Sequence, residues 1–195
     1  MSSRDTILNA VRANRPAPVD LPDVPLFGEG RDDDLLGRFF TAFKLMGGTV
    51  LELGDGDPVA PLRARLGSAG VVVSRVPEIA GTRDLDLTLP PSSLADVDIA
   101  IVRAAFGVAE TGSIALSERE LGVNTLAYLA QHLIVLLDPA DIVINLHHAY
   151  RRPEFARSRY LVFHTGPSAT ADIEGVLIHG AQGVRSLSIL PLPRE

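Results

Sequence analysis

Two apolar runs constrain the fold of this chain more than any other feature. Residues 97–102 read Val-Asp-Ile-Ala-Ile-Val, and residues 132–137 read His-Leu-Ile-Val-Leu-Leu. Runs this short and this apolar are typical of strands that are buried inside a sheet. Further runs of strand character lie at residues 49–53, 71–73, 160–164, 176–179 and 186–190. We therefore expect a sheet with a well-buried interior, to which residues 85–89 add a short edge strand.

Helical segments separate several of these runs. Asp32 to Asp34 precede an apolar stripe of helical spacing that ends at Gly47-Gly48. Asp57-Pro58 opens a second helix, and Asp138-Pro139 opens a third that runs to about Tyr150. Strand, helix and strand in this order imply parallel pairing through right-handed crossovers, with helices on both faces. The predicted fold class is therefore α/β, a three-layer Rossmann-like arrangement around a mostly parallel sheet.

The first 30 residues differ from the rest of the chain. A serine cap at Ser2 or Ser3 starts a short helix, and four prolines then make residues 15–30 an extended arm. We expect an N-terminal helix and Pro-rich arm at residues 1–30, followed by one α/β domain at residues 31–195. The arm is expected to cover the main body or to grip another subunit, and to carry no chemistry.

The composition excludes several classes of function. A formal charge of −6, with 18 dispersed basic residues, argues against a nucleic-acid partner, because such binding uses clustered Lys and Arg. No apolar run approaches the length of a membrane span, and no secretory signal is visible, so we expect a cytoplasmic protein. With zero cysteines, the chain has no thiolate for a Cys-ligated iron–sulfur cluster, and no metal site is indicated. Phosphate-loop and dinucleotide-binding motifs are also missing from the sequence.

Two polar segments, at residues 107–113 and 165–174, each follow a buried run. In an open α/β sheet, ligands sit beyond the carboxyl ends of the strands, so we expect the two segments to meet there. Their backbone N–H groups and hydroxyls suit a small organic acid or a phosphate, with Arg185 as a bidentate partner. The alternative is that both are simple turns, with Glu110 solvated and Asp172 capping a short helix. The expected ligand-binding residues are Gly107, Thr111, Gly112, Ser113, Gly166, Ser168, Thr170 and Asp172.

Three ordered motifs resemble the LUD-domain family of lactate-utilisation proteins. They are Gly-Val-Ala-Glu-Thr-Gly-Ser at 107–113, His-Leu-Ile-Val at 132–135, and Gly-Pro-Ser-Ala-Thr-Ala-Asp-Ile-Glu at 166–174. The resemblance extends from about residue 30 to the end and points to the short, single-domain members. It implies a fold similar to the sugar-phosphate isomerase and CoA-transferase group. The chain departs from the family where Ala169 and Gln182 replace an arginine and a histidine.

The resemblance implies roles for two more residues and for partner proteins. His132 would join the ligand site, and Glu110 would be the catalytic carboxylate, acting as a nucleophile or a base. The chain would support oxidation of L-lactate to pyruvate, with cysteine-rich and iron–sulfur subunits carrying the electrons and no cofactor bound by this chain itself. Two alternatives remain open. One is a stand-alone enzyme of the CoA-transferase, sugar-phosphate isomerase or folate cyclo-ligase group, and the other is a regulatory module that binds a small molecule.

Overall fold

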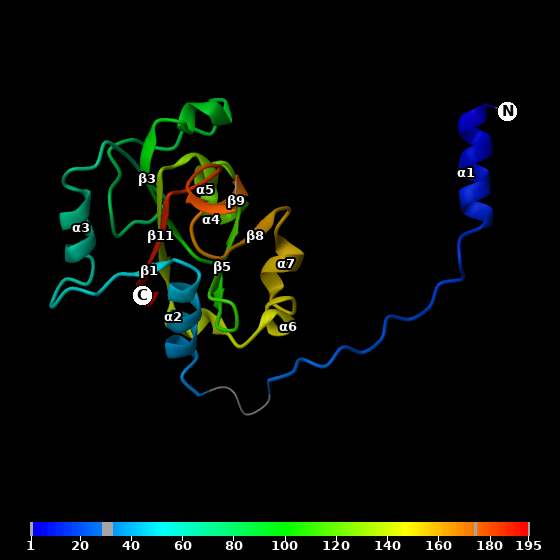
Figure 1. Ribbon diagram of the computed structural model, residues 1–195, viewed down its shortest axis with the longest axis horizontal. Helices are drawn as coiled ribbons and strands as arrows, with labels where there is room; N and C mark the ends of the chain where they lie inside the picture. The colour runs from blue at the N-terminus through cyan, green and yellow to red at the C-terminus, as the bar shows by residue number, and fades with distance from the viewer. Residues whose placement is uncertain (1, 29–32, 174, 195) are drawn as a thin grey trace.

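Five parallel strands form the central sheet of the computed structural model, which describes residues 2–28, 33–173 and 175–194, with only the backbone at 172, 173 and 179 (Figure 1). Their order is β1 (Thr49–Val50), β11 (Ser186–Pro191), β6 (His132–Leu137), β3 (Val97–Arg103) and β2 (Val71–Ser74). The predicted α/β class with a mostly parallel sheet is confirmed. No helix in these ranges is long and apolar enough to cross a membrane.

Strand β6 lies at the centre of the sheet because all of its residues after His132 are apolar. It pairs in parallel with β3 on one side and β11 on the other, so that Leu133 lies opposite both Ala100 and Leu187. The side chains of residues 133–137 are all buried. Full burial of one such side chain stabilises the fold by about 2 kcal/mol relative to exposure. The two faces of this strand feed separate apolar clusters, one on each side of the sheet.

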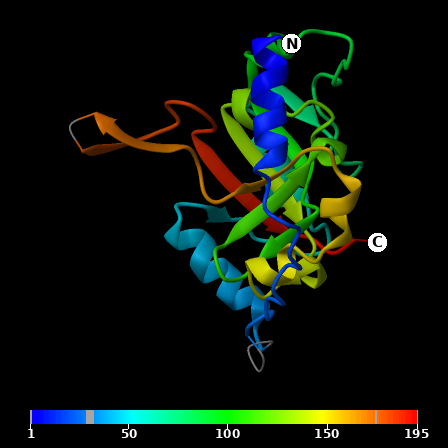
Figure 2. The same cartoon turned by 90° about the vertical axis from the view of Figure 1, so that its right-hand side faces the viewer.

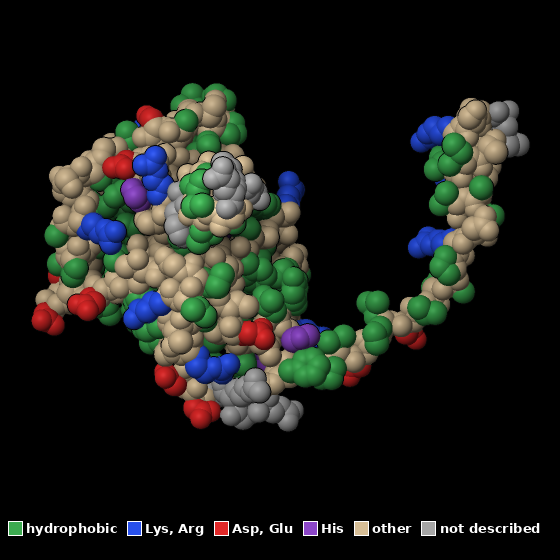
Figure 3. Space-filling view, viewed as in Figure 1, with side chains coloured by type: hydrophobic (Ala, Val, Ile, Leu, Met, Phe, Trp, Pro, Cys, Tyr) green, Lys and Arg blue, Asp and Glu red, His purple; other side chains and the backbone are tan. Residues whose placement is uncertain are grey.

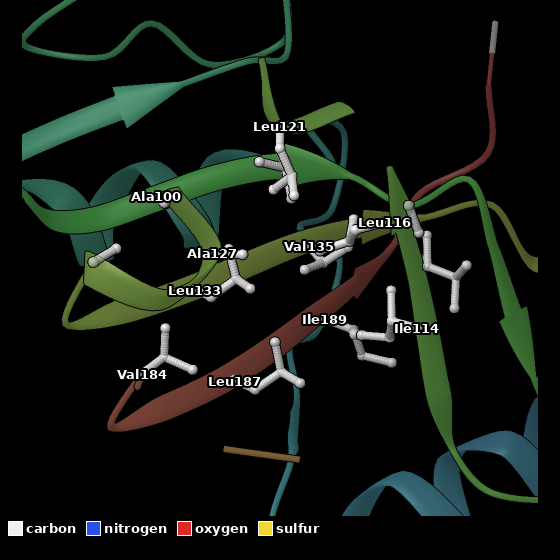
Figure 4. Close-up of a cluster of buried hydrophobic side chains, with 14 of the residues drawn as sticks. Ala100, Ile114, Leu116, Leu121, Ala127, Leu133, Val135, Val184, Leu187 and Ile189 are labelled. Atoms are coloured by element: carbon white, nitrogen blue, oxygen red, sulfur yellow. The ribbon is translucent and has the colours of Figure 1, made fainter. Parts of the chain in front are cut away.

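A second sheet of four strands packs over one face of the central sheet. Its order is β7 (Ile142–Val143), β4 (Phe106–Val108), β5 (Ser113–Ser117) and β8 (Leu161–His164). Figure 4 shows Ile114 and Leu116 of β5 facing Val135 and Ile189 of the central sheet, and all four side chains belong to one buried cluster. Because β8 is the last strand in this order, it is an edge strand of the second sheet.

The second sheet contradicts two of the sequence-based expectations. Residues 138–150, predicted as one helix, form a 3₁₀ turn η2 (Pro139–Asp141), strand β7 and a short helix α6 (Leu146–Ala149). The β-branched pair Ile142 and Val143 lies beside Gly107 and Val108 in a parallel ladder, and this pairing outweighs local helix propensity. Strand β10 (Val176–His179) was expected in the central sheet, but it pairs only with β9 (Ala169–Ile173) in a hairpin that projects from the body (Figure 2).

Helices pack against both sheets, and α2 contributes to the buried cluster that the two sheets share. Helix α2 (Leu35–Leu45) starts at Asp34, whose carboxylate accepts the Gly37 N–H at 2.9 Å, and it buries Phe39 and Phe43. Helix α3 (Ala60–Leu66) covers the opposite face of the central sheet through Leu62. The remaining helices are η1 (Pro91–Leu94), α4 (Glu118–Leu121), α5 (Leu126–Leu129) and α7 (Pro153–Arg157). The expected edge strand at 85–89 is irregular.

The N-terminal arm extends away from the body (Figure 1). Helix α1 (Ser3–Ala13) has the expected serine cap, at Ser2, but it buries no side chain. The arm is held at its base, where the Asn145 side-chain amide donates to the carbonyls of Leu26 and Phe27 at 2.9 and 3.1 Å. In this structure the arm therefore does not cover the body as expected. Residues 29 and 30 of the predicted arm lie outside the described part of the chain.

We expect deletion of residues 1–25 to change the free energy of unfolding by less than about 0.5 kcal/mol, because α1 buries no side chain. Asn145→Ala is the matched comparison. It removes both the grip on the arm and the N-cap of α6, and should cost about 1–2 kcal/mol. Urea unfolding followed by circular dichroism measures both values. A larger loss from the deletion than from the substitution would mean that the arm packs on the body in solution.

Candidate functional site

The two polar segments singled out in the sequence lie side by side at the end of the second sheet. Three hydroxyls connect them. The Oγ of Ser113 lies 2.6 Å from the Oγ1 of Thr111 and 2.6 Å from the Oγ1 of Thr165. Ser113 is only 3% exposed, so these two neighbours satisfy a hydroxyl that is removed from water. We call Thr111, Ser113 and Thr165 the hydroxyl chain.

Two glycines with positive φ bring these segments against helix α2. Gly112 has φ +65°, and a Cβ there would lie 2.3 Å from the backbone nitrogen of Phe43. Gly166 has φ +82°, and a Cβ there would lie 2.0 Å from the carbonyl oxygen of Met46. No other residue type allows so close an approach in this backbone conformation. Both glycines therefore act by packing backbone on backbone, and they place the hydroxyl chain at the carboxyl end of α2.

A cavity of 230 Å³ begins where the hydroxyl chain ends. Its walls come from the segment around Thr165 and Ser168, from the end of β8, from α5, and from the turn before β11. The polar residues that line it are Tyr128, His164, Thr165, Ser168, Gln182 and Gly183. Among the described residues of the lining, none carries a formal charge at neutral pH. The cavity therefore offers uncharged hydrogen-bonding groups.

His164 is the most unusual group in this cavity. It is 8% exposed, and its Nε2 atom is buried without a hydrogen-bond partner among the described residues. Burial lowers the pKa of His164 to about 4, because the charged imidazolium is poorly solvated there. The ring is therefore neutral at physiological pH and retains one free nitrogen. From the sequence, His164 was only a strand-end histidine, and its burial is a product of tertiary structure.

Two backbone groups in the cavity wall have no hydrogen-bond partner among the described residues. The backbone N–H groups of Gln182 and Gly183 donate no hydrogen bond to any described residue. Neighbouring free N–H groups in a turn are suited to an anionic oxygen. On the other side of the cavity, the Tyr128 hydroxyl lies 2.6 Å from that of Tyr160. Burial and this hydroxyl neighbour raise the pKa of Tyr128, so its phenol stays protonated.

The remaining residues of the first predicted segment have other contacts. The Oε2 of Glu110 accepts the Leu146 N–H at 3.2 Å, so this exposed carboxylate stabilises the start of α6 and does not line the cavity. Gly107 lies within β4, and its missing side chain makes room for Phe39 and Leu137.

The second predicted segment is shorter than expected. Only residues 165–168 form a loop, because residues 169–173 are strand β9, which pairs with β10. Thr170 therefore lies in a ladder opposite Ile178. Asp172 lies within the same strand, so the expected short helix does not start at this residue, and its side chain is outside the described part of the structure.

His132 and Arg185 are not brought to this cavity. The Nδ1 of His132 lies 2.8 Å from the Oγ of Ser186, and both side chains line a different cavity beside α3. Arg185 is exposed, and its backbone N–H donates to the carbonyl of Gln131. The single predicted site thus divides into separate places, of which the cavity at Thr165 keeps Gly166 and Ser168. No group of three or more His, Asp and Glu side chains suited to a metal occurs among the described residues.

Comparisons with known proteins agree with this fold. The sequence pattern of the LUD domain matches residues 92–190, just over half of the 195 residues. An uncharacterized protein of Neisseria meningitidis serogroup B is 27% identical over 140 residues, which are 69% of this chain and 59% of that protein. The chain thus spans about three fifths of this relative's length.

A solved structure shows the same architecture. It is the crystal structure of a DUF162 family protein from Deinococcus radiodurans, with a TM-score of 0.60 and 18% identity. The match covers 84% of this chain and 97% of that one. At this identity the likeness establishes the fold alone. With the sequence match over half of the chain, it follows that the protein belongs to the LUD-domain family, which is associated with lactate utilisation.

Proposed function

We propose that this chain is a subunit for L-lactate utilisation that binds a small organic acid in the cavity at Thr165. The observation that carries the proposal is the combination of the hydroxyl chain with the buried, unpartnered Nε2 of His164 at one cavity. Family membership supports the lactate association. The cavity volume of 230 Å³ suits a ligand of a few heavy atoms.

The cavity matches the chemistry of a 2-hydroxy acid. The carboxylate accepts hydrogen bonds from Ser168 and from the free N–H groups of Gln182 and Gly183, and the 2-hydroxyl bonds to the Nε2 of His164. A buried polar group without a partner costs about 1–3 kcal/mol, so filling the free valence of His164 favours binding. Because no carboxylate lines the cavity among its described residues, no like charge opposes the anion.

Oxidation of lactate to pyruvate releases two electrons and two protons, and this chain has no cysteine to hold a cluster that accepts them. We therefore assign electron transfer to cysteine-rich, iron–sulfur partner subunits. Anaerobic affinity purification of the chain, followed by iron and sulfide analysis of the proteins that accompany it, tests this part. Purification without any iron-containing partner would contradict it.

Ligand binding is tested by calorimetric titration of the full chain with L-lactate and with pyruvate. Thr165→Val and Ser168→Ala should each weaken the binding of L-lactate about tenfold, equivalent to about 1.4 kcal/mol. Thr88→Val is the matched control, since its hydroxyl bonds only to Asp86 on a distant exposed turn. Equal affinity in all three variants, or no titratable heat with the folded wild type at millimolar acid, would show that the cavity does not bind these acids.

A further inference from the structure

A second cavity, of 290 Å³, lies on the face of the central sheet that α3 covers. Leu62 of α3 shares a buried cluster on this face with Leu136 and Leu190. The cavity lies at the amino end of the strands, between the end of α3 and residues of β3, β6 and β11. This cavity belongs to a different face and a different sheet from the one at Thr165. An inference from it does not rest on the proposed function.

The floor of this cavity combines polar side chains with Ile99 and Ile134, although the rest of the face is apolar. Along β11 the side chains on this face are Ser186, Ser188 and Leu190, and they lie opposite His132, Ile134 and Leu136 of β6. Ser188 is only 1% exposed. Hydroxyls and an imidazole bury less apolar surface than aliphatic side chains would at the same positions, so they reduce the hydrophobic stabilisation of this face. The amino end of the face is therefore suited to a polar ligand.

The two charged residues in the wall, Arg65 and Asp98, form no salt bridge with each other. Arg65, in the last turn of α3, makes no ion pair or hydrogen bond with any described residue, whereas Arg63 of the same helix pairs with Asp57. Asp98, at the start of β3, accepts the Gly70 N–H at 2.9 Å through one carboxylate oxygen. Figure 3 shows basic and acidic side chains scattered over the face of the molecule that it presents.

The partial negative charge at the carboxyl end of a helix favours a cation, and this explains why Arg65 stands in the last turn of α3. It does not explain the polar side chains of the cavity floor. His132 adds a second nitrogen donor. Its Nδ1 bonds with Ser186, which orients the ring and leaves Nε2 for a ligand. When Nε2 carries the proton, Nδ1 accepts the Ser186 hydroxyl, so the donors left for a ligand are the guanidinium, the imidazole Nε2–H and the hydroxyls of Ser68 and Ser188, which together exceed what the two oxygens of a carboxylate accept. They match the three terminal oxygens of a phosphate.

We propose that this cavity binds a small phosphate monoester. The phosphate lies against Arg65, His132 and the serine hydroxyls, and a hydroxyl of the ester group donates to Asp98. Asp98 repels a bare phosphate but accepts a hydrogen bond from a polyol, so the cavity discriminates in favour of the ester. The ligand class is therefore a phosphorylated small polyol.

Calorimetric titration of the full chain in a phosphate-free, low-salt buffer tests this assignment, with glycerol 3-phosphate and inorganic phosphate as probes. We expect saturable binding of glycerol 3-phosphate, tighter than that of inorganic phosphate. Arg65→Gln should weaken it at least about tenfold, and Ser188→Ala about threefold. Asp98→Asn should reduce the preference for the ester. A histidine side-chain NMR signal, assigned to His132 by its loss in His132→Gln, should shift on titration.

Arg63→Gln is the matched control, because it removes a cation from the same helix outside the cavity. It should leave the affinity within about twofold. Equal losses in Arg63→Gln and Arg65→Gln would show a general charge effect, and tighter binding of L-lactate than of glycerol 3-phosphate would show a carboxylate site. Either outcome, or no saturable binding of the ester, overturns the proposal. Thr165→Val should not change phosphate affinity, so failure here and failure of the lactate site remain distinguishable.

Discussion

Gly112→Ala is expected to destabilise the protein by about 3 kcal/mol or more, enough to remove much of the stability of an ordinary domain. Two costs combine. A φ of +65° disfavours any side chain by about 1–2 kcal/mol, and the new Cβ would lie 2.3 Å from the backbone nitrogen of Phe43. The backbone atoms of Phe43 cannot rotate away from the new Cβ, as the end of a flexible side chain could. Relief therefore requires α2 to move, which disturbs the buried rings of Phe39 and Phe43.

Gly56→Ala separates the two costs. Gly56 has nearly the same backbone conformation, φ +77°, but nothing lies within 4 Å of the Cβ that alanine would add. Its substitution should cost only the conformational part, about 1 kcal/mol. Urea unfolding followed by circular dichroism measures the difference between the variants. If both lost the same free energy, close packing of the hairpin turn on α2 would not be the reason for glycine at residue 112.

The wild-type protein should lose about 2 kcal/mol of its free energy of unfolding between pH 7 and pH 5 because of His164. The pKa of this residue is about 4 in the folded state and 6.5 in the unfolded chain. Between these values the unfolded state binds a proton that the folded state does not, so stability falls as pH falls. Carboxyl groups whose pKa is lowered in the folded state change the stability only at pH values below this window. Backbone N–H donors from Arg194 and Ala140, for example, lower the pKa of Asp138 below its usual 3.8.

His164→Gln tests this assignment because glutamine keeps a hydrogen-bonding group but does not titrate. The loss between pH 7 and pH 5 should shrink by about 2 kcal/mol in this variant. His147→Gln is the control, since His147 is exposed beside Phe27 and its removal should leave the pH dependence unchanged. Stability is measured by urea unfolding at both pH values. An unchanged slope in His164→Gln would mean that the imidazole is hydrated and charged in the folded protein.

The local sequence correctly predicted those elements in which residue propensity and tertiary environment favour the same structure. The apolar run 132–137 predicts a buried strand, and β6 lies at the centre of the parallel sheet. Asp34 and the stripe from Leu35 predict helix α2. The motifs at 107–113 and 166–174 also pointed to the family, which the matched residues 92–190 confirm. In these segments, propensity, capping and burial favour the same structure, so local patterns are sufficient.

Pairing between distant strands decided the rest. Ile142 and Val143 are compatible with a helix, and they become strand β7 because Gly107 and Val108 present a free edge to them. In the same way, the sequence placed Ser113 and residues 165–166 in two separate ligand-binding segments. The hydroxyls of Ser113 and Thr165 meet only because β5 pairs with β8 at the end of α2.

The sequence by itself therefore determined the α/β class, the buried central strand and the family. His132 begins the predicted strand, so the strand assignment already favours the amino end of the sheet, and the tertiary structure decided its neighbours there, Ser186 and the cavity beside α3. The same structure buried His164 and left its Nε2 without a partner. Burial and strand neighbours are properties of contacts between segments far apart in the chain, and no local pattern of residues records them.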